Sequence, residues 1–248
     1  MKKLWIIARK DIKESYRSRS TYVYIAIMLV LTLSYFSSYN AVINSLNNQG
    51  ANQQTIYDAS RAFMISLAYA LPMIYSILVC TIFAQYSVVV DKAKRNIESL
   101  MVTPTSLRQI WMGKTLAVTV PSVVIGISVA IIGYVVLNII AVEPKAGSFI
   151  VPSVFAIVTA LIIVPALIFT IVSIVIYIQL VISNPRIANL VFTGIFLLLF
   201  FGTTTLSAAG IDINFGLIYL GIIVLCAAIS YFLSRSLTKE RVILSSKG

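Results

Sequence analysis

The sequence contains no histidine, only two cysteines and few charged residues among its 248 positions. Without histidine there is no Ser-His or Cys-His pair for nucleophilic catalysis, and the eight acidic residues are too scattered to form a general acid/base couple. Charged residues make up 11% of the chain against 59% hydrophobic residues, which leaves too little polar surface to cover a soluble globule. The composition predicts an integral membrane protein that is not itself an enzyme.

The two cysteines, Cys80 and Cys226, both fall within long apolar stretches and form no paired motif. Neither a disulfide nor a metal site is therefore predicted. We expect both to be core residues, and we expect this chain to bind no metal or other cofactor.

Six charge-free stretches are long enough to cross about 30 Å of hydrocarbon as helices of roughly 20 residues. They cover residues 21–42, 62–88, 116–142, 149–182, 187–206 and 213–233. The fourth stretch raises the alternative of two spans, because residues 146–185 carry no charge. Splitting it would place the basic C-terminus outside and leave no loop between the halves, so we predict one long helix kinked at Pro165.

The placement of charge agrees with six spans and both termini in the cytoplasm. Every lysine and arginine except Arg61 and Lys145 then lies on the cytoplasmic side, as the positive-inside rule predicts. This topology and anionic lipid headgroups explain the net charge of +11, so nucleic-acid binding is not expected. The prediction is an all-α membrane protein of the plasma membrane. An interfacial helix over 1–19 precedes a six-helix transmembrane domain over 20–235, and a cytoplasmic tail covers 236–248.

The N-terminal segment has only five apolar residues in a row and no small-residue cleavage site after them, so it is not a signal peptide. On a helix, Trp5, Ile12 and Tyr16 share one stripe while lysines and arginines face away from it. This pattern is typical of a helix in the cytoplasmic headgroup layer, in contact with membrane lipid. An ordinary basic flank of the first span is the alternative.

The predicted spans contain no titratable group that could couple the protein to an ion gradient. Every acidic residue lies outside the six stretches, and polar residues within them, such as Gln85, Asn138 and Gln179, are neutral. Neutral polar side chains in membrane helices usually form hydrogen bonds between helices. If the protein does work, its energy comes from a partner in the cytoplasm.

The stretch NIESLMVTPTSLRQIWMGKT, residues 96–115, ends in Gly-Lys-Thr, as a nucleotide-binding phosphate loop does. Such a loop needs a glycine where this chain has Arg108, because its backbone N–H groups wrap the phosphates and side chains must not crowd them. Nor does a buried strand lead into it, since Thr103-Pro104 precede. We therefore expect this chain not to bind ATP, and we predict that Gly113-Lys114 opens a helix.

A short helix is predicted between spans two and three, within a cytoplasmic loop that covers residues 91–114. Asn96 is a good N-cap, and Glu98 in the first turn suits the positive end of the helix dipole. Thr103 before Pro104 ends the helix, because the residue before a proline disfavours helical geometry.

The short helix has an apolar knob, by which we mean Ile97, Leu100 and Met101 on one of its faces. A loop surrounded by solvent would not need such a knob. The stretch is therefore expected to contact another molecule.

A second helix is predicted to start at a capping box made by Ser106 and Gln109 and to continue as the third span. Trp111 is expected at the depth of the membrane interface, and Lys114 is expected among the lipid headgroups, exposed to solvent.

The third span has a face of small residues, because Ser122, Gly126 and Ala130 recur every four residues. Small residues allow another helix to approach closely. This face is predicted either to pair two copies of the protein or to pack within one subunit.

The run DKAKRNIESLMVTPTSLRQIWMGKTLA, residues 91–117, resembles the first cytoplasmic loop of the type-2 ABC transporter permeases. The opening stretch ARKDIKESYRSRS, residues 8–20, resembles that family's amphipathic N-terminal segment. Six spans with cytoplasmic ends also agree. The loop residues that match the family's pattern in register are Glu98, Leu100, Thr103, Pro104, Ser106, Arg108, Ile110, Gly113 and Lys114.

The chain also departs from the pattern of that family. Arg95-Asn96 stand where relatives commonly have Gly-Thr. The predicted outer loop, 43–61, has only 19 residues, whereas relatives that export sodium or drugs often carry a large domain there. Many relatives have short re-entrant helices between spans five and six, but here only a small feature around 207–213 can fit.

The resemblance implies that the short helix is a coupling helix, which docks into a groove on a separate ATP-binding subunit. ATP and Mg²⁺ would then be bound by that partner. The residues that the resemblance assigns to this contact are Asn96, Ile97, Glu98, Leu100, Met101, Thr103 and Pro104.

The resemblance further implies a permease that pairs with a second copy or a homologue and with two ATPase subunits to export a substrate. The absence of charge along the spans favours amphipathic peptides, lipids or hydrophobic drugs as that substrate. The alternative is a non-transporting assembly or sensor module that uses the same loop to anchor an ATPase.

Overall fold

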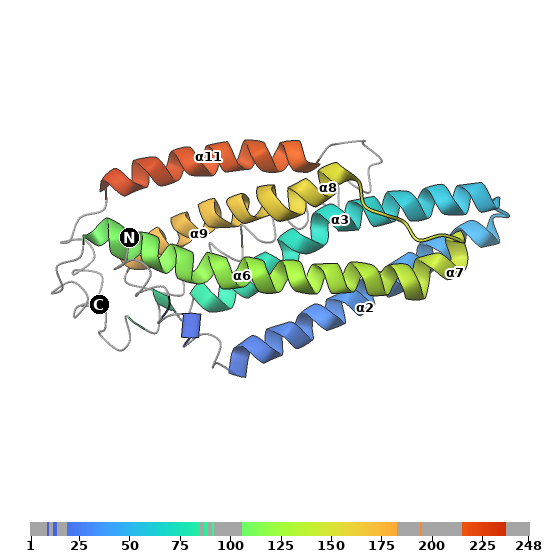
Figure 1. Cartoon of the computed structure of the whole chain (residues 1–248), viewed down its shortest axis with the longest axis horizontal. Coiled ribbons are helices and arrows are strands. Elements are labelled where there is room, and N and C mark those ends of the chain that lie inside the picture. Colours follow the sequence, from blue (N-terminus) through green and yellow to red (C-terminus); the bar gives the residue numbers. More distant parts are fainter. Residues whose placement is uncertain are drawn as a thin grey trace.

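The structure is a computed structural model, and all regular structure in the residues that it describes is helical (Figure 1). It describes residues 9, 12–13, 19–84, 87–88, 91, 106–182, 194 and 215–236. Helices suit such an apolar chain, because a helix satisfies its own backbone N–H and C=O groups where no water is present.

The described helices follow the order of the predicted spans. Their bounds are α2 Arg19–Asn48, α3 Gln53–Ala84, α6 Leu107–Leu137, η2 Asn138–Val142, α7 Glu143–Ala146, α8 Val154–Val158, η3 Thr159–Ile163, α9 Val164–Val181 and α11 Phe215–Ser236. The segments η2 and η3 are π-helical. α6, η2 and α7 form one continuous run, and α8, η3 and α9 form another. With α2, α3 and α11, this gives five helical runs that are long and apolar enough to cross a membrane. The predicted fifth span, 187–206, lies outside the described residues except for Gly194, so the count of six stays a prediction.

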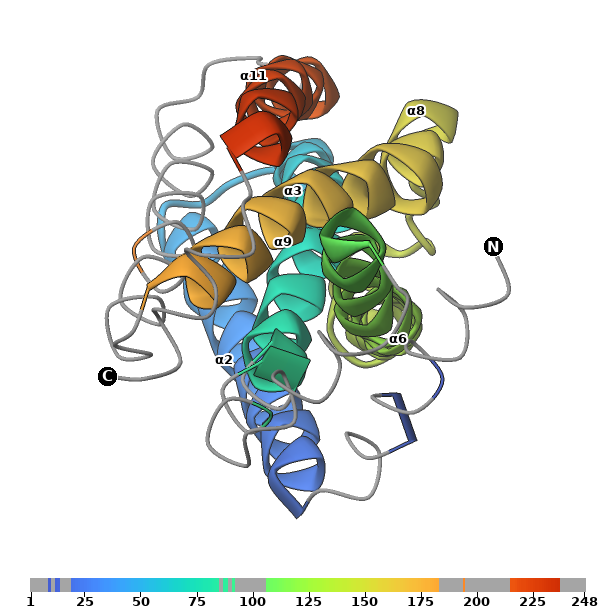
Figure 2. The same cartoon turned by 90° about the vertical axis from the view of Figure 1, so that its left-hand side faces the viewer.

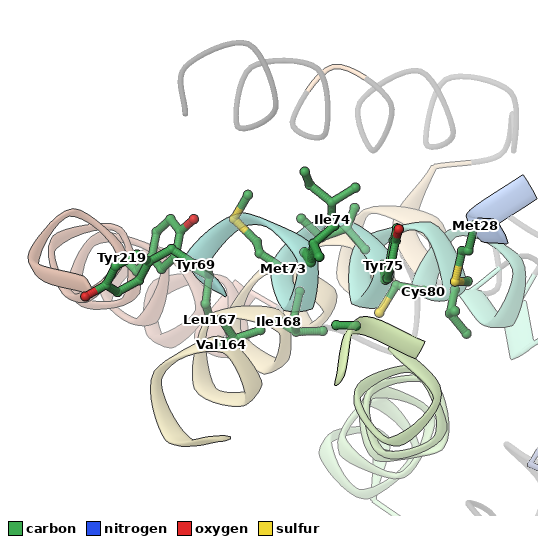
Figure 3. Close-up of a cluster of buried hydrophobic side chains, with 14 of the residues drawn as sticks. Met28, Tyr69, Met73, Ile74, Tyr75, Cys80, Val164, Leu167, Ile168 and Tyr219 are labelled. Atoms are coloured by element: carbon green, nitrogen blue, oxygen red, sulfur yellow. The ribbon is translucent and has the colours of Figure 1, made fainter. Parts of the chain in front are cut away.

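The central helix of the bundle is α3. In the most apolar stretch of α3, 72% of the residues are buried, whereas the figure is 11% for the corresponding stretches of α2 and α11. Figure 2 shows α2, α6 and α9 around α3, and α11 on the outer side of α9. Core side chains from four helices line up along α3 in Figure 3, among them Met28, Tyr69, Met73, Ile74, Tyr75, Cys80, Val164, Leu167, Ile168 and Tyr219.

The first two described helices run antiparallel, as their hydrogen bonds show. A bond of 2.7 Å joins the hydroxyls of Thr32 and Tyr75, and a bond of 2.8 Å joins those of Tyr39 and Ser60. A later position on α2 thus pairs with an earlier one on α3. The end of the bundle at which α2 begins and α3 ends is called the loop end below.

The last two long helices run parallel. A Cβ added at Gly216 in α11 would meet the side chains of Phe155 and Thr159, and the hydroxyls of Ser173 and Ser230 bond at 2.8 Å further along. Both α9 and α11 therefore end at the loop end (Figure 1). Two parallel helices need a connection that returns along the bundle, so residues 183–214 join the loop end to the opposite end.

At the opposite end the connection between α2 and α3 is shorter than the sequence predicts. α2 continues to Asn48 and α3 begins at Gln53, so residues 49–52 alone join them. Gly50 has a φ of 72°, a left-handed conformation that glycine adopts without strain. The predicted outer segment 43–61 is therefore mostly helical, because a charge-free stretch marks only the embedded part of a helix.

Hydrogen bonds also hold the connection after α6 at the opposite end. Asn138 donates to the carbonyl of Ile150 at 2.7 Å and accepts from the Ile150 N–H at 3.1 Å. Lys145 donates to the side-chain oxygen of Asn40 in α2, and its Nζ lies 5.7 Å from the centre of the Tyr39 ring. The neutral Asn138 thus binds the backbone of a connecting segment instead of a neighbouring helix.

The long fourth stretch forms one helical run from Val154 to Val181 through α8, η3 and α9. Pro165 is the second residue of α9, and α9 directly follows the π-helical turn η3. A proline removes one N–H donor and crowds the carbonyl four residues earlier, at Leu161. Leu161 lies within η3, so the wider π-helical turn accommodates the proline without a break in the helix.

Candidate functional site

The residues predicted to contact an ATPase lie outside the described residues. They are Asn96, Ile97, Glu98, Leu100, Met101, Thr103 and Pro104. The two places where this segment joins the bundle are described, because the structure includes Asp91 before it and Ser106 after it. These two attachment points, both at the loop end, define the candidate site.

The second attachment point is the capping box that the sequence predicts. The backbone N–H of Gln109 donates to Ser106 Oγ at 3.3 Å, and the Ser106 N–H donates to Gln109 Oε1 at 3.1 Å. The cap satisfies backbone donors that no helical carbonyl can reach. Because α6 begins at Leu107, the last part of the predicted loop 91–114 is already helix.

The first attachment point is joined to α6 by a buried ion pair. Lys114 Nζ lies 2.6 Å from Asp91 Oδ2, and the exposed fractions of the two side chains are 0% and 5%. The same Nζ donates to the backbone carbonyl of Ser87, which is in a π-helical conformation together with Val88. Lysine can donate three hydrogen bonds, so it can serve both oxygens at once.

The prediction that Lys114 is exposed among the headgroups is therefore wrong. A charge held away from water is stable only when an opposite charge and further hydrogen bonds replace its hydration, as Asp91 and Ser87 do here. One signal in the sequence could have revealed this burial. Lys114 shares a helix face with Ile110, Ala117 and Val118, all apolar and all buried.

The Gly-Lys-Thr motif is not a phosphate loop in this structure. Gly113, Lys114 and Thr115 are buried within α6, more than one turn after its first residue. Their backbone N–H groups lie inside a regular helix, where carbonyls of the preceding turn accept their hydrogen bonds. Phosphate oxygens would find no cradle of free N–H groups there.

Trp111 belongs to the core and joins α6 to α9. Its side chain is only 4% exposed, and Nε1 donates to the carbonyl of Ser173 at 2.8 Å. The indole N–H is thus satisfied by a backbone carbonyl instead of by the headgroup layer, and the depth of Trp111 in the membrane stays a prediction. The first two turns of α6 therefore bind Ser87 and Asp91, which follow α3, through Lys114, and they bind α9 through Trp111.

The face of small residues on α6, Ser122, Gly126 and Ala130, is buried against α3 of the same chain. A Cβ added at Gly126 would come within 2.4 Å of Ser76 Oγ and 2.5 Å of its backbone nitrogen. The sequence leaves open whether this face pairs two copies or packs within one subunit. In the structure it packs within one subunit.

The predicted interfacial helix is described at only three positions. Arg9 and Lys13 are exposed and Ile12 is half-buried, all in helical conformation. Trp5 and Tyr16 lie outside the described residues. A lipid-facing stripe on this segment stays a prediction.

An apolar groove of about 320 Å³ lies between α3, α6 and the run of α8 and η3. The polar group of its lining residue Tyr134 is occupied, since the hydroxyl donates to the Ile150 carbonyl at 3.1 Å. A groove of this chemistry can accept a hydrocarbon chain. It is lined by Leu67, Ala68, Leu71, Pro72, Ile127, Ala130, Ile131, Tyr134, Val135, Phe149, Pro152, Ala156, Ile157, Ala160 and Leu161.

Within the part of the chain that the structure describes, no three histidine, cysteine or acidic side chains gather closely enough to hold a metal ion. Cys80 is buried and Cys226 is half-buried, and both are free thiols. Cys226 is thus less of a core residue than the sequence predicts, because α11 covers only the outside of the bundle.

Long apolar helices that cross the hydrophobic layer several times define a multi-pass membrane protein. A comparison with family models identifies which kind. Residues 5–217 match the model described as ABC-2 family transporter protein. The chain therefore belongs to the ABC-2 transporter family and is a permease of the plasma membrane, as the resemblance of its loop predicts. A comparison with curated proteins found no match.

As a member of this family, the protein works with ABC ATPase subunits and a transported substrate.

Proposed function

We propose that this protein is the membrane-spanning subunit of an ATP-driven exporter, with both termini and the 92–105 segment in the cytoplasm. The observation that carries the proposal is the family match, because residues 5–217 include both the described bundle and the predicted coupling segment. The permease pairs with a second copy or a homologue, and two separate ATPase subunits bind ATP and Mg²⁺. This chain itself performs no hydrolysis.

The contact with the ATPase is made by the apolar knob of Ile97, Leu100 and Met101. A few apolar side chains that fill a pocket, surrounded by charged residues, position a small interface well. The knob lies between Asp91 and Ser106, both of which are fixed to helices of the bundle. Movement of the ATPase would thus reach the membrane helices through these two points.

The need for an outside source of energy is supported by the charges within the bundle. Among the described residues the buried charged side chains are Asp91 and Lys114, and they neutralise each other. A carrier driven by an ion gradient usually keeps a titrating or ion-binding group inside the membrane. ATP hydrolysis by a partner is therefore the source that fits.

The substrate is proposed to be hydrophobic or amphipathic, such as a lipid, an amphipathic peptide or a hydrophobic drug. The apolar groove between α3 and α6 supports this class, because apolar side chains make up its lining. A strongly charged substrate would lose its hydration there without compensating partners.

The test is to purify the tagged permease with its copurifying ATPase and to reconstitute the complex in vesicles that contain a fluorescent phospholipid. The expected results are ATP hydrolysis and ATP-dependent movement of the phospholipid, or of a fluorescent amphipathic peptide or hydrophobic dye in parallel vesicles. A complex that hydrolyses ATP but moves none of the three probes would favour the non-transporting module. Failure of any ATPase to copurify would contradict the coupling proposed here.

A further inference from the structure

The ion pair between Asp91 and Lys114 closes the loop that carries the predicted coupling segment. Asp91 is the last described residue before this segment, and Lys114 lies two turns into the helix that follows it. The pair thus connects the last described residue before the segment with the second turn of the helix after it. This inference rests on the proposed function, since it concerns how movement of the loop reaches the helices.

The contact is short, buried and directional. The distance between Lys114 Nζ and Asp91 Oδ2 is 2.6 Å, and the bond from Nζ to the Ser87 carbonyl adds a second direction. Hydrogen bonds between ionised groups are about twice as strong as those between neutral groups, and they depend on geometry. A shift of α6 relative to Ser87 and Asp91, which follow α3, would stretch both contacts at once.

Elsewhere the interface between α3 and α6 is built differently. Gly126 lies against Ser76 and lets the two helices approach closely, but their contact contains no ion pair. The bonds from Lys114 to Asp91 and to Ser87 add a directional link at the loop end.

We propose that Lys114 is a positioning residue for energy coupling, because its ion pair with Asp91 makes the chain beyond α3 and the start of α6 move as one unit when the ATPase displaces the 92–105 segment. The nearby bond from Trp111 to the Ser173 carbonyl extends this unit to α9. Without the ion pair, the segment would move at its two ends independently, and ATP hydrolysis would no longer drive the outer ends of the helices.

The experiment uses the copurified complex of permease and ATPase and follows hydrogen exchange with and without a non-hydrolysable ATP analogue. The readout is the nucleotide-dependent change in exchange at residues 53–62, the start of α3 at the end of the bundle away from the ion pair. This readout needs no knowledge of the substrate. ATP hydrolysis and the amount of bound ATPase are measured on the same samples.

Four variants and one control separate a coupling role from a structural one. Lys114→Met and Asp91→Asn each remove one charge. The double variant Lys114→Met with Asp91→Leu replaces the pair by apolar groups, which usually preserves the fold of a protein that loses a buried ion pair. The exchange variant Asp91→Lys with Lys114→Asp restores opposite charges. Arg108→Met removes an exposed charge from the same helix and serves as the control.

The expected result is that the single variants and the apolar double variant still bind the ATPase and hydrolyse ATP but lose most of the change at residues 53–62. The exchange variant should recover much of it, and the control should retain it. If the apolar double variant keeps the full change, the charges are dispensable and the inference is overturned, even where the single variants fail to fold. If the unaltered permease copurifies with no ATPase, the proposed function itself falls, a result distinct from that one.

Discussion

At the scale of single residues, the burial of Lys114 changes what its removal should do. Lys114→Ala breaks the buried ion pair with Asp91, and loss of one member of such a pair typically destabilises a protein by about 3–5 kcal/mol. We expect a clear fall in the thermal unfolding temperature of the purified permease in detergent.

The matched control is Arg108→Ala, on the same helix but exposed to solvent. Exposed charges contribute about 0 to 1 kcal/mol, so this variant should unfold close to the parent. Equal unfolding temperatures for the two variants would show that the buried ion pair contributes little to stability.

A second prediction at this scale concerns the glycine at the closest approach of α3 and α6. In Gly126→Ala the new methyl group would stand 2.4 Å from Ser76 Oγ and 2.6 Å from its Cα, so backbone must shift. Overpacking of this kind costs about 1–3 kcal/mol. The unfolding temperature in detergent should fall accordingly.

The control for this change is Gly221→Ala in α11, where nothing lies within 4 Å of an added Cβ. Alanine is the better helix former by about 1 kcal/mol, so this variant should be neutral or slightly stabilised. A Gly126→Ala protein as stable as Gly221→Ala would show that the two helices have room to separate.

Single residues also show where reasoning from sequence fails. The capping box of Ser106 and Gln109 was predictable, because both partners lie within one turn and need only local geometry. The pairing of Lys114 with Asp91 was not predictable, since it depends on how two residues that are 23 positions apart in sequence come together in the fold. Counting spans by the absence of charge assigns both residues to solvent.

At the scale of elements, the predicted coupling helix yields its own test. Leu100→Asp places a charge where the apolar knob is proposed to enter a pocket of the ATPase, and burying an unpaired charge costs several kcal/mol. The variant should still insert into the membrane, but much less ATPase should copurify with it, as measured on gels of the purified complex.

The matched control places the same charge at the other end of the bundle. Gln49→Asp lies in the exposed connection between α2 and α3, at the opposite end from the knob. It should copurify with as much ATPase as the parent does. The role assigned to Leu100 is wrong if Leu100→Asp also retains the parental amount.

Among the elements, span positions were predictable and helix lengths were not. The apolar stretches 62–88 and 116–142 lie largely on α3 and α6, because hydrophobicity decides which residues a membrane accepts. Gln53, however, begins α3 well before the stretch does. A helix can continue beyond its apolar part into water. The hydropathy of the sequence therefore does not show where the helix ends.

At the scale of the whole molecule, the directions of the helices bear on a region outside the described residues. α9 and α11 run parallel, since Gly216 packs on Thr159 and Ser230 bonds Ser173. The chain between them must therefore pass from the loop end to the opposite end. Residues 187–206 carry no charge and are long enough to make that crossing as one helix.

This arrangement gives a prediction about membrane topology. The end of α2 at Asn48 lies at the opposite end of the bundle, whereas α11 ends at the loop end with Ser236. Lys239 and Arg241 follow Ser236, and basic residues next to a membrane helix lie on its cytoplasmic side. Single cysteines introduced at Asn48 and at Ser246 should therefore react from opposite sides, Asn48 from outside the cell and Ser246 from the cytoplasm.

The measurement is labelling by a membrane-impermeant maleimide, first on intact cells and then on permeabilised cells. The Asn48→Cys protein should be labelled in both samples, and the Ser246→Cys protein should be labelled only after permeabilisation. The parent chain gives the background from Cys80, which is buried, and from Cys226, which is half-buried. Labelling of both introduced cysteines on intact cells would mean an even number of crossings between them and the loss of one predicted span. The segment 187–206 would then have to return to the opposite end without spanning the membrane, and the cytoplasmic C-terminus would be wrong with it.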